Sequence, residues 1–483
     1  MSELLNRLEE LEKKSAALEP SEGERDNYIK TISDYSNQFI NQIDEINTFS
    51  LSRANASKLR IDKEKKSLNE LLNLYTEEVV NHGLIPSSGG HIGYIPGGGI
   101  YLSAIGDFLA DITNEYAGMY FGSPGAVTIE NELVNWMKEI FHFPETAVGN
   151  LTSGGSIANL IALTAARDKH KIKNEKIEKS VVYLSPQVHH CIHKALRIIG
   201  LEDVIIRELE LDEFWRIKTN ELKHHIEVDK KLGLNPFLVI ASAGTTDTGA
   251  VDDLNEIGDI ASLNNLWFHI DGAYGGFFIL TERAKHLFKG IEKADSLVID
   301  PHKGLFLPYG LGAVLVKDKE ALFHSHHYTA NYMQDANDPD LPMNPADASP
   351  ELTKHFRGLR MWVPLQMLGI DPFKACLEEK LYLTDYFRNE LEKIGFKLGP
   401  VPDLSVSYFW YEQKKIDSNL FNQKLMDLIH EDGRIFLSST KLNGQQVIRM
   451  AILSFRTKKH TIDTCVEMIE RCLEKTKEYF AKN

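Results

Sequence analysis

Cysteine is scarce in this chain, and its placement argues against the structures that depend on it. Only four cysteines occur among 483 residues, and none of them forms a CxxC pair: Cys191, Cys376, Cys465 and Cys472. The sequence therefore indicates neither a disulfide framework nor a thiolate zinc site. It also lacks an apolar run long enough to span a bilayer and the apolar core of a signal peptide. We expect a protein of the reducing cytoplasm.

Positive charge is in deficit as well. The formal net charge is -15 at pH 7, and no block of lysine and arginine is long enough to follow a phosphate backbone. We therefore expect no nucleic-acid partner, because nucleic-acid binding depends on clustered basic residues. An acidic surface also argues against attachment to anionic membranes. The content of hydrophobic residues, 43%, is that of an ordinary globular protein and excludes wholesale disorder.

The first 90 residues are predicted to form a helical segment. Leu4, Leu8 and Leu11 recur on one face of a stretch rich in Glu and Lys, and a second amphipathic run covers about residues 61–80. An amphipathic arm of this kind needs an apolar surface to pack on. That surface is either the body of its own chain or a second subunit.

Residues 91–357 are predicted to form a large α/β domain with a mainly parallel sheet. Short apolar runs alternate with helical patterns, and their hydrophobicity is continuous, as in strands buried on both faces. The runs expected to be strands are residues 181–184, 204–206, 237–240, 266–270, 297–299 and 312–316. Residues 324–351, rich in Asp, Asn and Pro, are expected to form a long functional loop. Residues 358–483 are predicted to form a smaller α+β domain, in which residues 397–411 form strand and turn between helices.

Polar residues follow four of these strands. His189, Thr246, Asp271 and Lys303 each come after an apolar run, at or near the end of a strand. In an open α/β sheet the ligand crevice lies at the carboxyl ends of the strands. We therefore expect the four side chains to converge on one site, although they are far apart in the sequence.

A glycine-rich stretch precedes a predicted helix at residues 152–156, with the sequence TSGGS. Glycines at a helix N-terminus let backbone N–H groups approach an anion such as a phosphate. The alternative is a plain Ser-capped helix without a ligand. No GKS or GKT sequence accompanies the glycines, so a P-loop is not supported.

One ligand, pyridoxal phosphate, would use all of these groups. A protonated pyridine nitrogen offsets the desolvation of a buried acid such as Asp271. A lysine such as Lys303 supplies the imine, and we expect burial to lower its pKa. A histidine such as His189 offers a flat ring to lie over the pyridine. Each residue alone has an ordinary structural explanation, but their occurrence together at strand ends favours the cofactor.

The chain resembles the group II pyridoxal-phosphate decarboxylases, from about residue 92 to residue 455. The resemblance is carried by the TSGGS stretch, by QVH at residues 187–189, by GTT at residues 244–246, by DGA at residues 271–273 and by DPHK at residues 300–303. It implies an aspartate-aminotransferase-like large domain of fold type I. It also implies a cofactor site that contains Gly155, Ser156, His189, Thr246, Asp271, Asp300, His302 and Lys303.

The resemblance further implies a decarboxylase that converts an L-amino acid to an amine. The Tyr-rich entrance favours an aromatic substrate, and the family's active-site entrance maps onto residues 89–99. Tyr94, Gly97 and Tyr120 would line the substrate pocket, although each could equally be plain packing. A homodimer is implied too, because in this family the N-terminal helices embrace the second subunit.

Two departures from the family leave other reactions open. Most eukaryotic members have Asn where this chain has Asp300, and Asp occurs in more distant relatives that include carbon–carbon lyases. The family's loop tyrosine, which protonates the substrate carbon after carbon dioxide leaves, has no counterpart at residues 343–349. Tyr328 and Tyr332 lie earlier in the loop and are the local candidates for this catalytic role. In relatives where that tyrosine is changed, an aldehyde is formed instead.

Two further interpretations are weaker. His189, His190 and His193 have partial helical spacing, but HExxH is absent and no acidic ligand stands at a helical offset, so no metal site is predicted. The glycines of residues 89–99 match no spacing tied to a phosphate. An inactive scaffold that binds the cofactor is the alternative outside the enzymes.

Overall fold

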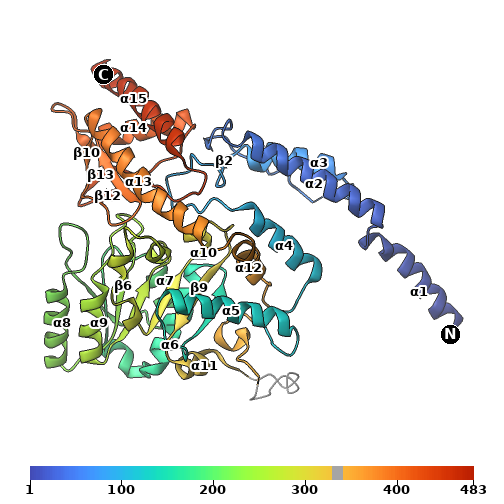
Figure 1. Cartoon of the computed structure of the whole chain (residues 1–483), viewed down its shortest axis with the longest axis horizontal. Coiled ribbons are helices and arrows are strands. Elements are labelled where there is room, and N and C mark those ends of the chain that lie inside the picture. Colours follow the sequence, from blue (N-terminus) through green and yellow to red (C-terminus); the bar gives the residue numbers. More distant parts are fainter. Residues whose placement is uncertain (62, 329–340, 483) are drawn as a thin grey trace.

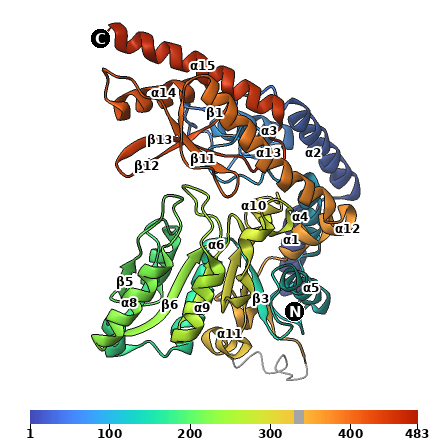
Figure 2. The ribbon, with the colours of Figure 1, turned by 60° about the vertical axis from the view of Figure 1, so that its left-hand side comes forward.

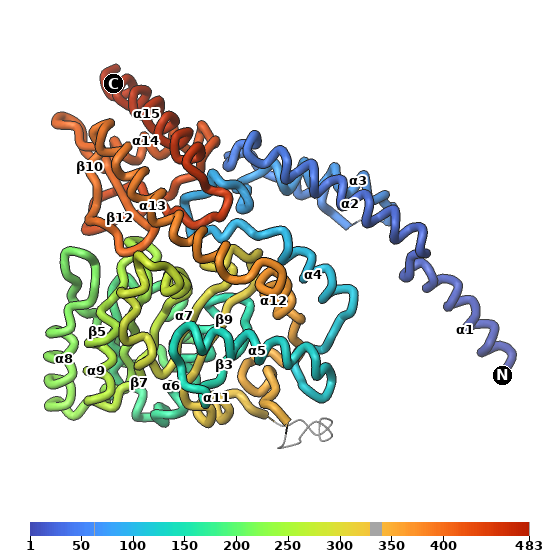
Figure 3. The backbone as a smooth tube through the Cα atoms, viewed as in Figure 1, coloured from blue at the N-terminus to red at the C-terminus, as the bar shows by residue number. Residues whose placement is uncertain are grey.

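The computed structural model describes residues 1–61, 63–328 and 341–482. A large α/β body carries a smaller sheet-and-helix unit on one side, and the N-terminal helices project away from both (Figure 1). Figure 2, turned by 60°, shows the central sheet between its covering helices. The continuous tube of Figure 3 follows the chain from the N-terminal arm, through the body, to the C-terminal helix beside the small sheet.

The central sheet has seven strands in the order β3-β9-β8-β7-β6-β4-β5. Neighbouring strands from β5 to β8 pair in parallel, and β9 and β3 complete the sheet in antiparallel pairing. The α/β fold class with a mainly parallel sheet is thus confirmed. The strands are β3 (Val148–Thr152), β4 (Ser180–Leu184), β5 (Ile205–Glu208), β6 (Asn235–Ser242), β7 (Trp267–Asp271), β8 (Ser296–Ile299) and β9 (Gly312–Val316).

Six of the seven strands were predicted, and β3 was not. Its sequence, VGNLT, lacks the continuous apolar run that marks a strand buried on both faces. The pairing with β9 buries it nevertheless, and Asn150 is satisfied by donating to the carbonyl of Pro345 at 2.8 Å. Tertiary contacts therefore stabilise this strand, and its local hydrophobic pattern does not predict it.

Helices cover both faces of the sheet because successive strand residues point to opposite sides. On β7, Phe268 and Ile270 pack in the cluster that includes α8 and α9, whereas Trp267 packs in the cluster that includes α6 and α7. The covering helices are α5 (Pro124–Ile140), α6 (Gly155–Lys169), α7 (Cys191–Ile198), α8 (Thr219–Lys231), α9 (Leu254–Asn264) and α11 (Lys319–His326).

The N-terminal arm consists of α1 (Ser2–Ser15), α2 (Glu22–Gln42) and α3 (Leu68–Tyr75). The second helix was expected from about residue 61, but α3 begins only after Ser67. A capping box fixes this start, since the Ser67 hydroxyl accepts from the Glu70 N–H and the Glu70 carboxylate accepts from the Ser67 N–H. A π-helical turn continues α3 over Thr76–Val80, and β1 (Phe49–Ser50) and β2 (Gly83–Leu84) form a short antiparallel pair. Neither α1 nor α2 buries a residue.

The C-terminal part contains a four-stranded antiparallel sheet in the order β10-β11-β13-β12. Only the stretch of β10 (Lys397–Leu398) and β11 (Val406–Trp410) was predicted, and β12 (Ser438–Leu442) and β13 (Gln445–Ala451) were missed. The helices are α12 (Gly358–Leu368), α13 (Asp371–Lys393), α14 (Ser418–Asp432) and α15 (Lys459–Lys482). Helix α12 packs on α4 (Tyr101–Thr113) and so joins this part to the segment that follows the arm.

A buried ion pair joins the chain after residue 341 to the central sheet. The Lys354 ammonium contacts the Glu130 carboxylate of α5, and both side chains are buried. The same ammonium donates to Asn150 Oδ1 at 3.1 Å, and Glu130 accepts from the Leu151 N–H at 3.0 Å. These bonds hold the end of β3, which leads directly into the glycine-rich stretch at residues 152–156.

Replacing Lys354 by Met should destabilise the protein strongly, because it leaves the buried Glu130 charge unpaired. We expect a loss of about 3–5 kcal/mol in the free energy of unfolding, measured by urea denaturation. The double variant Lys354→Met/Glu130→Leu should recover much of this loss. As a control, Lys285→Met removes an exposed pair with Glu282 and should leave the midpoint nearly unchanged. Equal losses in Lys354→Met and Lys285→Met would contradict the assignment.

Candidate active site

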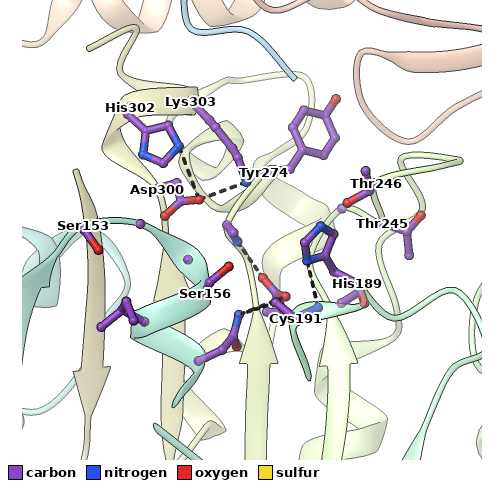
Figure 4. Close-up of a pocket in the computed structure, with 18 of the residues that line it drawn as sticks. Ser153, Ser156, His189, Cys191, Thr245, Thr246, Tyr274, Asp300, His302 and Lys303 are labelled. Atoms are coloured by element: carbon purple, nitrogen blue, oxygen red, sulfur yellow. Dashed lines mark hydrogen bonds and ion pairs between the residues drawn. The ribbon is translucent and has the colours of Figure 1, made fainter. Parts of the chain in front are cut away.

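A cavity of about 260 Å³ opens at the carboxyl ends of the parallel strands. Figure 4 shows side chains from α6, from the loops after β4 and β6, and from the turn that carries Lys303 converging on it. The structure brings together every residue that the sequence analysis assigned to a cofactor. They are Gly155, Ser156, His189, Thr246, Asp271, Asp300, His302 and Lys303.

The glycine-rich stretch forms the N-terminus of α6. Gly154 is the N-cap, and no side chain in the described part of the chain caps the first turn of the helix. Its φ of 152° lies in the region that favours glycine. The alternative of a plain Ser-capped helix is therefore wrong, and the N–H groups of the first turn remain available for an anion.

Asp271 ends β7 and is buried. Its Oδ1 accepts from the Ala273 N–H at 3.1 Å, and its Oδ2 accepts from Asn159 Nδ2 at 3.3 Å. Burial raises the pKa of Asp271, while the hydrogen bonds and the Lys303 charge act in the opposite direction. A cationic ligand atom placed beside this carboxylate would offset the desolvation of its charge.

Lys303 lies in the one-turn helix α10 (Pro301–Gly304) that follows β8. Its Nζ is 2.9 Å from Asp300 Oδ2, and Figure 4 marks this ion pair. Burial lowers the pKa of Lys303, but the paired Asp300 carboxylate and the nearby Asp271 carboxylate outweigh burial, so the net pKa is raised. The expectation of a lowered pKa was wrong, because it left out an acid three residues away that the turn folds back onto the amine.

Asp300 has an oxygen that the described residues leave unused. Its Oδ1 is buried and has no hydrogen-bond partner among them. The carboxyl lies against the N-terminus of α6, since a Cβ added at Gly155 would be 3.0 Å from Asp300 Oδ2. The unpaired Asp300 oxygen would need a hydrogen-bond donor, whereas the uncapped N–H groups of α6 beside it would favour an anion.

Two histidines contribute neutral rings. Burial lowers the pKa of His189 to about 4, and its Nδ1 accepts from the Cys191 N–H at 3.3 Å. Burial also lowers the pKa of His302, whose Nδ1 donates to the carbonyl of Leu311 at 2.6 Å. A flat phosphorylated aldehyde with a ring nitrogen would match these rings, the α6 N-terminus, the acid and the amine.

The three residues predicted to bind substrate do not line this cavity in the single chain. Tyr94 is 58% exposed and packs on Phe436, with ring centroids 5.2 Å apart. Gly97 lies against the backbone of His302, where a Cβ would come within 2.1 Å of the carbonyl oxygen. The backbone N–H of Tyr120 donates to Asn344 Oδ1 at 2.8 Å.

Of the two loop tyrosines, Tyr328 belongs to the described residues, and it does not line the cavity. Tyr328 follows α11 and is 90% exposed. Tyr332 lies outside the described residues. The expected loop begins later than predicted, because His324 and His326 still belong to α11.

Several residues near the site were missed from the sequence. Asn159 and Cys191 line the cavity, and Asn159 could have been found as a buried amide in the apolar run of a helix. Arg449 of β13 donates to the carbonyls of Thr246 and Gly93, and it thus ties the loop after β6 to the small sheet. Its role has no local sequence signal, because it depends on how the small sheet packs.

Comparison with known proteins agrees with this geometry. Residues 58–411 match the pyridoxal-dependent decarboxylase conserved domain. An aromatic-L-amino-acid decarboxylase of Bacillus atrophaeus is 35% identical over 394 residues, which cover 80% of this chain and 82% of that protein. A phenylacetaldehyde synthase of Arabidopsis thaliana is 28% identical and covers 72% of this chain and 75% of its own length.

The fold is also that of solved enzymes. The crystal structure of Oryza sativa TDC with PLP and tryptamine superposes with a TM-score of 0.89 at 20% identity, covering 94% of this chain and 98% of that one. The predicted cofactor, pyridoxal phosphate, and the predicted fold type are confirmed. The chain belongs to the pyridoxal-dependent decarboxylase family and is a pyridoxal-phosphate-dependent amino-acid carboxy-lyase.

Proposed function

We propose that Lys303 binds the aldehyde carbon of pyridoxal phosphate and that Asp271 pairs with its ring nitrogen. Lys303 is the one lysine that lines the cavity among the described residues, and Asp271 is its buried acid without a paired cation. Bound pyridoxal phosphate supplies an electron sink for the electron pair left when carbon dioxide departs. By keeping a charge beside the ring nitrogen, Asp271 strengthens that sink.

The remaining cavity residues hold the cofactor in place. The N–H groups at Gly155 and Ser156 point from the N-terminus of α6 and bind the phosphate. His189 packs on the ring face, and the loop containing Thr246 bounds the cavity on the β6 side. Asp300 lies beside both His302 and Lys303. It holds the ammonium until the amine loses a proton and attaches to the cofactor.

Replacing Lys303 by Ala should abolish the visible absorbance band that the cofactor gives when it is bound to the lysine. Decarboxylation should fall by several orders of magnitude, because the amine is the covalent attachment point. Absorbance spectra of the purified proteins with added pyridoxal phosphate measure the band. The exposed Lys289→Ala variant should keep both the band and the activity. A wild-type protein without the band would refute the assignment.

The substrate is proposed to be an aromatic L-amino acid. Relatives named for aromatic amino acids support this proposal, and one solved neighbour holds tryptamine. The cavity supports it as well, because no arginine lines it within the described residues. An acidic side chain of a substrate would find no guanidinium partner there.

Aldehyde synthesis is the second candidate for the reaction. It is favoured by residues 343–349, which contain no tyrosine, and by the similarity to a phenylacetaldehyde synthase. The exposed Tyr328 and the more distal Tyr332 remain the candidates for the proton donor of the decarboxylase route.

Product analysis separates these reactions. With Trp, Tyr, Phe and 3,4-dihydroxyphenylalanine as substrates, we expect one amine and one carbon dioxide for each amino acid consumed, without peroxide. An aldehyde synthase would instead consume oxygen and release aldehyde, ammonia and hydrogen peroxide along with carbon dioxide. A carbon–carbon lyase that cleaves a bond other than the one to the carboxylate would release no carbon dioxide, and an inactive scaffold would turn over none of the amino acids.

The protein is further proposed to act as a homodimer in the cytoplasm. The N-terminal arm projects from the body (Figure 1). The arm and α4 carry a series of exposed apolar side chains. Burying such a surface needs a partner, and a second copy is the partner proposed. The four free thiols fit a reducing compartment. The exposed residues include Leu4, Leu8, Leu11, Tyr28, Ile29, Ile32, Phe108 and Ile112.

The boundaries at residues 90 and 357 are likewise proposals. The seven-stranded sheet falls between them, over residues 148–316, and the four-stranded sheet falls after them, over residues 397–451. The helices of the arm precede residue 90. Each segment thus has its own layer of secondary structure.

The double variant Phe108→Asp/Ile112→Asp should convert the dimer to a monomer, because it places two charges on the apolar surface of α4. Sedimentation velocity measures the change. Leu263→Asp, at the exposed end of α9, serves as the control and should leave the sedimentation coefficient unchanged. A wild-type protein that sediments as a monomer would exclude the dimer.

A further inference from the structure

A row of buried polar groups leads from the core to Asp271. Trp267, His269 and Asp271 alternate along β7 and therefore point to the same face of the sheet. Ser296 of β8 lies beside His269 in the strand register, and Asn159 of α6 lies above both strands. All five side chains are buried.

The distances connect these groups into one chain of hydrogen bonds. Trp267 Nε1 is 2.8 Å from Ser296 Oγ, which is 2.8 Å from His269 Nδ1. His269 Nε2 is 2.7 Å from Asn159 Oδ1, and Asn159 Nδ2 is 3.3 Å from Asp271 Oδ2. The amide also lies 3.4 Å from Cys191 Sγ.

The chemistry of the first group sets the direction of the chain. The indole of Trp267 can only donate, so the Ser296 oxygen accepts from it. The Ser296 hydroxyl then has its own proton free for His269 Nδ1, which accepts. A neutral imidazole that accepts at Nδ1 carries its proton on Nε2, and this nitrogen donates to Asn159 Oδ1.

The hydrogen bond to Asp271, at the other end of the hydrogen-bonded chain, requires the same direction. A carboxylate only accepts, so Asp271 needs the NH₂ group of Asn159 and not its oxygen. The opposite tautomer of His269 would flip the Asn159 amide and set two oxygens 3.3 Å apart. It would also leave the Ser296 hydroxyl proton without its acceptor. Both ends therefore specify one arrangement.

We infer that the Trp267–Ser296–His269–Asn159 chain is a positioning device that keeps Asp271 ionised and aimed at the cofactor ring nitrogen. Hydrogen bonds to the charged form of an acid favour that form. This inference rests on the proposed pairing of Asp271 with the ring nitrogen. Of the four residues, only Asn159 lines the cavity, so the other three act through it.

The Ala273 N–H favours the ionised form of Asp271 through Oδ1, independently of the chain, but no side chain other than Asn159 donates to the acid within the described residues. Lys303 is paired with Asp300, and its ammonium charge is lost from this position when the amine attaches to the cofactor. Cys191 remains a neutral thiol, since burial raises its pKa to about 12. His269 stays neutral as well, because burial lowers its pKa to about 3. The Asn159 amide and the Ala273 N–H are the direct donors to Asp271.

The decisive experiment compares pyridoxal phosphate with an analogue in which carbon replaces the ring nitrogen. In Asn159→Leu the dissociation constant for pyridoxal phosphate should rise roughly 10- to 100-fold, the effect of losing a hydrogen bond to a charged group. The dissociation constant for the analogue should change less than about threefold, because the chain acts only through the ring nitrogen. His269→Leu should also raise the dissociation constant for pyridoxal phosphate more than that for the analogue, but by a smaller factor, since Asn159 loses the hydrogen bond that orients it.

The controls separate this chain from general damage and from the cofactor assignment. Asn422→Leu removes a buried, hydrogen-bonded amide in α14 and should lower the melting temperature without selectivity between the two ligands. Equal weakening of both ligands in Asn159→Leu, or no weakening, would overturn the inference. Wild-type protein that binds both ligands equally would instead refute the pairing of Asp271 with the ring nitrogen.

The direction of these hydrogen bonds can also be measured in the wild-type protein. Nitrogen NMR of the ¹⁵N-histidine apoprotein, with a His269→Gln spectrum for assignment, distinguishes the two neutral tautomers. We expect the proton of His269 on Nε2 at neutral pH. A proton on Nδ1, or a doubly protonated ring, would contradict the proposed direction.

Discussion

A carboxylate buried at the end of a strand is unfavourable unless something compensates for its charge, and the site is arranged around this constraint at Asp271. Burial raises the pKa of the acid, while the Ala273 N–H and the Asn159 amide favour its ionised form. The N-terminus of α6 has the converse requirement, because its uncapped N–H groups favour an anion. A single ligand with a cationic ring nitrogen and a phosphate relieves both.

The parallel sheet allows one ligand to contact both Asp271 and the N-terminus of α6. Strands that run in the same direction end at the same edge, so the segments after β4, β6, β7 and β8 deliver their side chains to one place. Antiparallel β3 and β9 serve the site differently. The end of β3 leads into the glycine-rich stretch. Glu130, which is paired with Lys354, fixes that end by accepting a hydrogen bond from the Leu151 N–H.

The electrostatics of Lys303 illustrate how local folding changes a residue's chemistry. Burial alone would favour a neutral amine. The single turn of α10 instead brings Asp300 to 2.9 Å from the ammonium and keeps the lysine charged before the cofactor is attached. Asp300 also lies close to the α6 N-terminus, so one acid connects the amine end and the phosphate end of the cavity.

The sequence by itself determined the fold class, the cofactor and eight residues that line the cavity, because strand ends, glycines and motif spacing are local properties of the chain. It misplaced the start of α3 and the charge state of Lys303, and it missed β3, β12, β13 and the Asn159 and Arg449 contacts. Only the tertiary structure decided these. The hydrogen bonds of Asn159 and Arg449 join residues far apart in the chain, and β3 is buried by its pairing with β9 and not by its own hydrophobicity. The roles of individual site residues, the dimer and the substrate remain predictions that rest on the sequence and the structure together.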